Sequence, residues 1–137
     1  MSFKWNALWM RGAAAYAGGP VHVSMNDYLI HHLRDIPRVA WSGMGLRRDW
    51  PRTEGALGLW MASFRWGWRQ VSVSVWRNAE DLRAFVRSPV HLQIMRDFKD
   101  VGALHTNAWA AERLDRELIW QQALDRLCGR VAGVAHH

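Results

Sequence analysis

The amino-acid sequence predicts an α+β fold, a ferredoxin-like split βαβ repeat with one antiparallel sheet. Stretches of alternating apolar and polar residues indicate strands, and stretches with apolar residues at helical spacing indicate helices. These elements follow the order β–α–β–β–β–α–β–α, which becomes the split repeat once one strand and the extra C-terminal helix are set aside. Two helices on one face would leave the other face of the sheet open, and self-association is the usual way to cover such a face.

The chain is expected to form one domain. Its 137 residues, half of them hydrophobic and 22% charged, can bury a core but are too few for two domains. We expect the domain to span residues 1–130 and residues 131–137 to form a tail. No apolar run reaches the roughly 18 residues of a membrane span, and the single cysteine, Cys128, excludes an internal disulfide. These features predict a cytoplasmic protein that does not enter a membrane.

The opening elements are predicted to be a strand and a helix. Residues 5–16 form the strand. Ser24, with Asp27 three residues later, resembles a capping box, and apolar residues follow at helical spacing, so a helix is predicted over residues 24–36. Pro37 ends this helix, because proline lacks the backbone N–H that a helix interior needs.

Three strands follow in the predicted order. Residues 39–48 form the first, and Gly43 and Gly45 within it are typical of a bulge. Residues 58–66 and 70–76 form a hairpin, and the second of these strands alternates strictly between two kinds of side chain. One face of it carries Val71, Val73 and Val75, and the other carries Ser72, Ser74 and Trp76.

Two helices and one strand complete the prediction. Asn78 caps a helix that runs to about Asp100 and restarts at Ser88, where a proline follows at the first helical position. Residues 104–112 alternate again and predict a strand. Residues 114–128 are amphipathic and predict the last helix.

The segment over residues 72–98 resembles the third strand and second helix of the antibiotic-biosynthesis-monooxygenase-like superfamily. The resemblance rests on Trp76 at the end of the strand, an acidic helix start, and then Leu82, Phe85 and His91. It implies a dimeric α+β barrel, in which two sheets close face to face around a ligand cavity, and therefore a homodimer. The superfamily includes cofactor-free oxygenases, haem-degrading enzymes and haem-containing oxygenases, so the implied cofactor is none, or haem.

The haem-degrading pattern is matched at one position of three. Those proteins use an Asn on the first strand, a Trp in the second helix and a His near the end of that helix. Asn6 matches the first position, whereas Phe85 and Met95 stand at the other two. Haem would therefore be held differently, with His91 or His105 as axial ligand and arginines on the propionates.

A candidate site combines two strands. If Val71, Val73 and Val75 face the helices, the alternate residues point into the barrel interior. The side chains expected to line one cavity are Ser72, Ser74, Trp76, His105, Asn107 and Trp109. His105 could act as a base on an acidic phenol or enol, and Asn107 could polarise a carbonyl. The alternative is that these residues fill a dimer interface with their hydrogen bonds satisfied.

His91 is the second titratable candidate. It could act as a general base or an axial haem ligand, or it could serve only the helix restart at Ser88. The sequence contains no paired carboxylates, Gly-rich phosphate loop or nucleophile elbow. Hydrolase, kinase and zinc-enzyme readings therefore have no support.

Tryptophan and arginine are both abundant. Ten tryptophans are more than one small core can hide, so some should line a pocket or an interface. The net charge is +6, and residues 1–79 hold 10 basic and 4 acidic side chains, so the whole excess lies there. This excess is concentrated in Arg47, Arg48, Arg52, Arg65, Arg69 and Arg77. It could form an anion-binding face or only a solvated surface, and the scarcity of lysine argues against nucleic acid as a partner.

Three functions are compatible with these features. The first is an oxidoreductase, a small monooxygenase-like barrel that takes a flat apolar or aromatic substrate in a Trp-lined cavity and needs no cofactor. The second is a haem-binding protein of the same fold with a His axial ligand. The third is a non-catalytic dimeric binding module that uses the Arg-rich N-terminal part as its contact surface.

Overall fold

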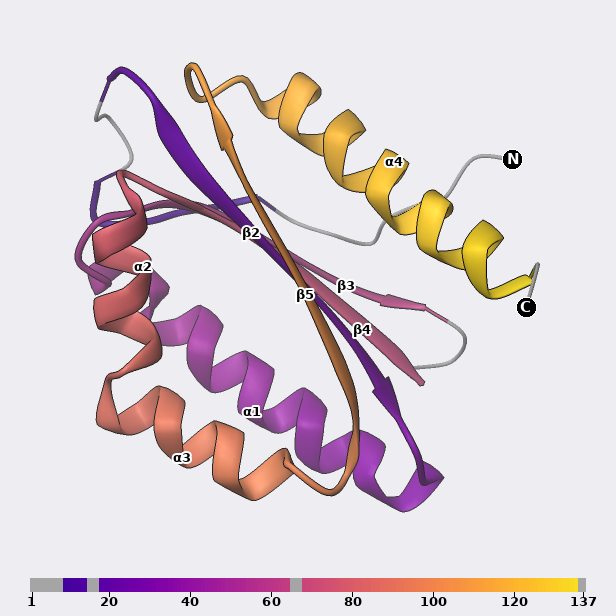
Figure 1. Cartoon of the computed structure of the whole chain (residues 1–137). Helices are drawn as coiled ribbons and strands as arrows, with labels where there is room; N and C mark the ends of the chain where they lie inside the picture. Colours follow the sequence, from indigo (N-terminus) through magenta and orange to yellow (C-terminus); the bar gives the residue numbers. More distant parts are fainter. Residues whose placement is uncertain (1–8, 15–17, 65–67, 136–137) are drawn as a thin grey trace.

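The computed structural model describes residues 9–14, 18–64 and 68–135. Its strands are β1 (Met10–Arg11), β2 (Val21–Ile30), β3 (Ala56–Phe64), β4 (Arg69–Trp76) and β5 (Gly102–Ala111). Its helices are α1 (Ile36–Asp49), α2 (Ala79–Val86), α3 (Pro89–Phe98) and α4 (Arg116–Ala135), with short 3-10 turns at Leu33–Asp35 and Trp50–Arg52. Helices α1, α2 and α3 lie on one side of the sheet and α4 lies on the other (Figure 1).

The topology is that of the predicted ferredoxin-like fold. All strands pair antiparallel, in the order β1-β3-β4-β2-β5. Within this order, β2-α1-β3-β4-α2-α3-β5 is a split βαβ repeat with its last helix broken in two. Strand β1 adds to the free edge of β3, and α4 is the predicted extra C-terminal helix.

The elements with strong local signals lie where the sequence predicts them. Strands β3 and β4 form the hairpin. The side chain of Asn78 caps α2 by accepting a hydrogen bond from the N–H of Asp81 at 2.8 Å. Ser88 caps α3 by accepting one from the N–H of His91 at 3.4 Å. These two caps place α2 and α3 end to end above the sheet.

Two neighbouring elements are exchanged relative to the prediction. The predicted helix over residues 24–36 is mostly strand β2, and the predicted strand over residues 39–48 is helix α1. Asp27 is not part of a capping box; its carboxylate accepts two hydrogen bonds from the guanidinium of Arg69, at 2.9 and 2.7 Å. Pro37 opens α1, where a missing N–H costs nothing. The central strand β2 is fixed by pairing with β4 on one side and β5 on the other.

The ends of the chain also differ from the prediction. The opening strand is only β1, and residues 5–8 and 15–16 of the predicted range lie outside the described residues. Helix α4 continues through Ala135, and the division into a domain over residues 1–130 and a tail over residues 131–137 stays a prediction. Residues 136–137 lie outside the described part of the chain.

The sheet has two different faces, set by the register of its strands. On one face, Ser24 lies opposite Ser74 on β4 and opposite Ala108 on β5. We call this the serine face; it also carries Ser72 and Trp76. On the other face, which we call the valine face, the buried side chains include Val21, Val23, Met25, Val71, Val73 and Val75. Helices α1 to α3 cover the serine face, and α4 covers the valine face.

The valine face is a closed core, not an open surface. Ile119, Ala123 and Leu127 of α4 pack on it and are fully or almost fully buried. The prediction that helices cover a single face of the sheet is therefore wrong, because α4 covers the second face. Self-association of the chain stays a prediction, but an uncovered sheet face no longer supports it.

Candidate functional site

A cavity of about 1020 Å³ lies between the serine face and helices α1, α2 and α3. Small or polar side chains form its floor on the sheet: Ser24, Asn26, Ser72, Ser74, Thr106 and Ala108. Its helical walls are mainly apolar and include Val39, Met44, Leu46, Leu82, Phe85, Leu92, Ile94, Met95 and Phe98. A large apolar hollow with a few polar groups on one side is typical of a small-molecule site.

The cavity exists because the three helices do not pack tightly on the sheet. No residue of α1, α2 or α3 is buried, in contrast to α4 on the valine face. The serine face presents side chains too short to fill the space beneath the helices. The two faces of the sheet therefore differ in packing. The valine face holds a packed core, and the serine face borders the cavity.

Three large aromatic side chains gather at one end of the cavity. The ring of Trp50 meets that of Trp76 edge-on at 5.2 Å between centroids, and Phe85 lies 5.2 Å from Trp76 and 6.4 Å from Trp50. We call Trp50, Trp76 and Phe85 the aromatic end. Trp50 and Trp76 are fully or almost fully buried and Phe85 is half-buried, so Phe85 is the ring of this group that a flat ligand can reach.

Hydrogen bonds fix the position of Trp76. Its indole N–H donates to Oγ of Ser74 at 2.9 Å, and that hydroxyl donates to the carbonyl of Ser24 at 3.3 Å. The indole N–H of Trp50, by contrast, is buried and has no hydrogen-bond partner in the described part of the chain. Unsatisfied buried donors are uncommon and cost stability.

His91 lies in the cavity wall beside the aromatic end. Its ring centroid is 5.1 Å from that of Phe85, and its Nδ1 is buried. The capping contact with Ser88 uses the backbone N–H of His91, so the ring is not needed for the cap. Burial lowers the pKa of His91 below its usual 6.5, and an interaction with the backbone of Val86 acts in the opposite direction. His91 is therefore a neutral imidazole at neutral pH.

The other ionisable groups of the lining are cationic or phenolic. Arg47, Arg96 and Lys99 line the cavity. Tyr28 donates its hydroxyl to the carbonyl of Phe98 at 2.7 Å, which ties β2 to the end of α3. Burial, followed by the charge of Asp35, raises the pKa of Tyr28 above 10.0, so it stays protonated.

The prediction that six side chains share one cavity is wrong. Ser72, Ser74 and Trp76 do line it, but His105, Asn107 and Trp109 lie on the valine face, opposite Asp27, Met25 and Val23 of β2. The error lies in which face of β4 was taken to point toward which helices. Its valines pack against α4 and not against α1 and α2, the helices before and after the hairpin. The predicted barrel interior and the observed cavity are therefore on opposite sides of the sheet.

The three residues outside the cavity, His105, Asn107 and Trp109, have other surroundings on the valine face. Trp109 donates its indole N–H to Gln122 of α4 at 2.9 Å, and the guanidinium of Arg126 lies 3.9 Å from its ring centroid. Trp109 therefore helps to hold α4 on the sheet. His105 is exposed on the edge strand and Asn107 is half-buried, and neither lines the cavity.

Sequence reasoning missed the contribution of α1. Val39, Gly43, Leu46, Arg47 and Trp50 all line the cavity. Their spacing of three or four residues is the helical signal that could have found them. This helical spacing was not recognised because Gly43 and Gly45 favour a bulged strand.

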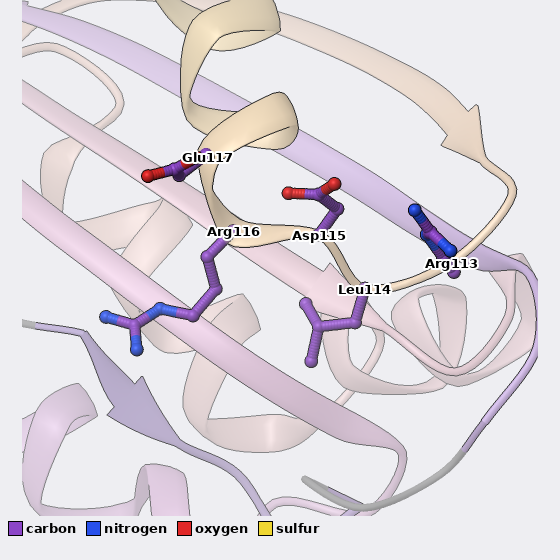
Figure 2. A pocket seen from close by; sticks show the side chains of 5 residues that line it. All are labelled: Arg113, Leu114, Asp115, Arg116 and Glu117. Atoms are coloured by element: carbon purple, nitrogen blue, oxygen red, sulfur yellow. The ribbon is translucent and has the colours of Figure 1, made fainter.

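A second hollow lies on the surface where β5 turns into α4. Figure 2 shows its five lining side chains, which come from one continuous stretch, residues 113–117. Asp115 caps α4 by accepting from the N–H of Leu118 at 3.1 Å, and the guanidinium of Arg116 lies 5.0 Å from the ring centroid of Trp9. The local contacts at the start of α4 account for this hollow. Its lining side chains form no pair of ionisable groups arranged for catalysis.

Two classes of site are not found in the described residues. No group of three or more His, Cys, Asp or Glu side chains there could hold a metal ion. In the same part of the chain, no helix is long and apolar enough to cross a membrane.

Comparison with known proteins identifies a fold. No family model matches the sequence, and no curated protein matches it either. Solved structures with the antibiotic-biosynthesis-monooxygenase-like fold do match. This confirms, at the level of the fold, the resemblance that the sequence predicts.

Three of these structures are described as oxygenases or as a haem-degrading enzyme. A variant of SnoaB, a cofactor-independent oxygenase from Streptomyces nogalater, superposes with a TM-score of 0.57 at 13% identity, over 66% of this chain and 92% of that one. A candidate monooxygenase from Lactobacillus acidophilus gives 0.60 at 8% identity, over 80% of this chain and 54% of that one. LmHde, a heme-degrading enzyme from Listeria monocytogenes, gives 0.55 at 12% identity, over 74% and 68%.

Proposed function

We propose that the chain binds a flat, apolar small molecule in the cavity and oxygenates it without a tightly held cofactor. The observation that carries the proposal is His91, a neutral imidazole in the wall of a large apolar cavity, next to the ring of Phe85. Support also comes from the likeness to SnoaB, described as a cofactor-independent oxygenase. A neutral base beside an apolar binding surface is what such an oxygenation needs.

The proposed reaction uses the substrate itself as the reductant. An acidic CH₂ group next to a carbonyl or an aromatic ring gives one proton to His91, and the carbanion that remains gives electrons to dioxygen. The resulting hydroperoxide loses water and leaves a new carbonyl, so one substrate and one dioxygen give one ketone and one water. Because Nδ1 is buried, Nε2 is the ring nitrogen of His91 left to receive the proton.

The other lining residues would position the substrate. Phe85, which packs against Trp50 and Trp76, would offer its ring to the substrate at one end of the cavity. On the floor, Ser74 is engaged with Trp76, and Thr106 donates to Asn26 at 3.1 Å. The hydroxyls of Ser24 and Ser72 would then be the polar contacts on the floor, since neither makes a hydrogen bond within the described residues.

Dioxygen uptake with an anthrone tests the proposal. Anthrones are flat, and their CH₂ group is acidic because the resulting anion is aromatic. We expect the protein to speed uptake, and His91→Gln to slow it by about 100-fold, the low end of what a general base contributes. The wild-type rate should persist below pH 6.5 and then fall as His91 takes up a proton, because its pKa is lowered.

The control is His105→Gln, on the valine face, which should leave the rate unchanged. Circular dichroism establishes that both variants are folded. Equal rates for wild type and His91→Gln would remove His91 from the chemistry, and no stimulation over buffer would remove the oxygenase proposal.

Haem binding is the second candidate function, favoured by the charges of the lining. Haem needs an axial ligand and cations for its two propionates. The imidazole of His91 and the side chains of Arg47, Arg96 and Lys99 fit that donor set. His105 does not, because it lies on the other face of the sheet. A Soret band on haem titration that is lost in His91→Gln would favour haem over cofactor-free oxygenation.

Two further predictions concern the partners of the chain. Homodimer formation stays a prediction, which light scattering at micromolar concentration tests. The non-catalytic binding module also stays a prediction, and four of its arginines, Arg48, Arg52, Arg69 and Arg77, lie within ion-pair distance of carboxylates. Arg65 lies outside the described residues.

A further inference from the structure

The charged side chains that line the cavity are all positive. Arg47, Arg96 and Lys99 line it, and none of the described lining residues is an Asp or a Glu. All twelve Asp and Glu residues of the chain lie in the part that the structure describes. Within an apolar hollow, such a distribution attracts an anion and disfavours a cation.

Arg47 contacts a residue that packs on the aromatic end. Arg47 is half-buried, whereas Arg96 and Lys99 are exposed. Its Nε donates to the sulfur of Met10 at 3.1 Å, and Met10 packs on the buried cluster that contains Trp50 and Trp76. Through Met10, the side chain of Arg47 is therefore connected to the packing of the aromatic end.

Arg47 differs from its neighbours in having no carboxylate partner. Arg48 and Arg52 both approach Asp49, at 3.7 and 3.0 Å, but Arg47 makes no ion pair within the described residues. A thioether is a weak acceptor, so both terminal nitrogens of Arg47 are left for another partner. The dipole of α1 favours a cation in its last turn, but Arg48 meets that need from the exposed surface.

We infer that the ligand is a flat aromatic acid whose carboxylate is bound by Arg47 at the aromatic end. This inference uses the cavity of the proposed function and adds the chemical class of the ligand. A guanidinium binds a carboxylate through two parallel N–H groups, which fixes orientation as well as position. Because His91 also borders the aromatic end, an acid held at Arg47 has its ring system directed toward that imidazole.

Two fluorescent probes of nearly the same shape test this inference. Anthracene carboxylate is flat and negatively charged, and anthracenemethanol is its neutral counterpart. In fluorescence titrations at one salt concentration, we expect the wild-type protein to bind the carboxylate at least about tenfold more tightly. Arg47→Gln should weaken carboxylate binding by about 10- to 100-fold and leave alcohol binding unchanged.

Arg48→Gln is the matched control, since it removes a neighbouring arginine of the same helix that does not line the cavity. It should bind both probes as the wild type does. Equal wild-type affinity for the two probes, or an Arg47→Gln variant that binds both less well by the same factor, would overturn the inference. Probe binding does not depend on dioxygen, so the acid preference can hold where oxygenation fails; if neither probe binds, the cavity itself is not a site.

Discussion

Replacing Ile119 with aspartate should lower the free energy of unfolding by about 4–5 kcal/mol, the range seen when an unpaired charge is forced into a core. Ile119 is 0% exposed and lies where α4 packs on the valine face. A carboxylate there has no cationic partner in that cluster of apolar side chains, so it must stay unsolvated or force α4 off the sheet. Urea denaturation followed by circular dichroism measures the loss.

The matched control is Leu118→Asp, one position earlier on the same helix. Leu118 is 50% exposed, and an acidic residue in the first turn of a helix is favourable. We expect its stability to stay within about 0.5 kcal/mol of wild type. If the two variants were equally stable, α4 would not be packed on the valine face.

Trp76→Ala should cost about 3–5 kcal/mol, the usual range for removing a large buried aromatic side chain. Trp76 is fully buried, and the substitution removes its contacts with Trp50 and Phe85. It also leaves the buried hydroxyl of Ser74 without its indole donor. The same variant should bind flat ligands less well, because the aromatic end loses its central ring.

Trp41→Ala provides the comparison for that measurement. Trp41 is on α1 but is 77% exposed, so its removal should change stability by no more than about 0.5 kcal/mol. The test is the difference between the two midpoints of denaturation. A Trp76→Ala variant as stable as Trp41→Ala would mean that the aromatic end is not packed as described.

The parts of the fold that the sequence predicts correctly have local signals. The β3–β4 hairpin, the caps at Asn78 and Ser88 and strand β5 each rest on residues close together in the chain. Strand β2 and helix α1 do not. Strand β2 pairs with residues 40 to 90 positions away, from Leu29 with Arg69 to Val21 with Ala111, and these pairings override spacings that favour a helix. The fold class is still right because the exchange keeps one strand and one helix in that part of the chain.

The site was half predicted for a related reason. Ser72, Ser74, Trp76 and His91 line the cavity, as expected of a ligand site. The relative facing of β4 and β5 depends on their common partner β2, whose identity as a strand is not evident from its own residues. Alternation within a strand shows which side chains share a face, but only register between strands shows which faces agree. His105 was therefore placed with Trp76 although the sheet separates them.

Helix α4 also has a consequence for how the chain folds during synthesis. The sheet is complete only when β5 has been made, because β5 pairs with the early strand β2. The residues that cover the valine face follow later still, in α4. Until they leave the ribosome, a sheet face rich in valine is open to water and to neighbouring chains, which is the state most prone to aggregation. Expression yield should therefore be more sensitive to substitutions in α4 than to equally destabilising ones in α2.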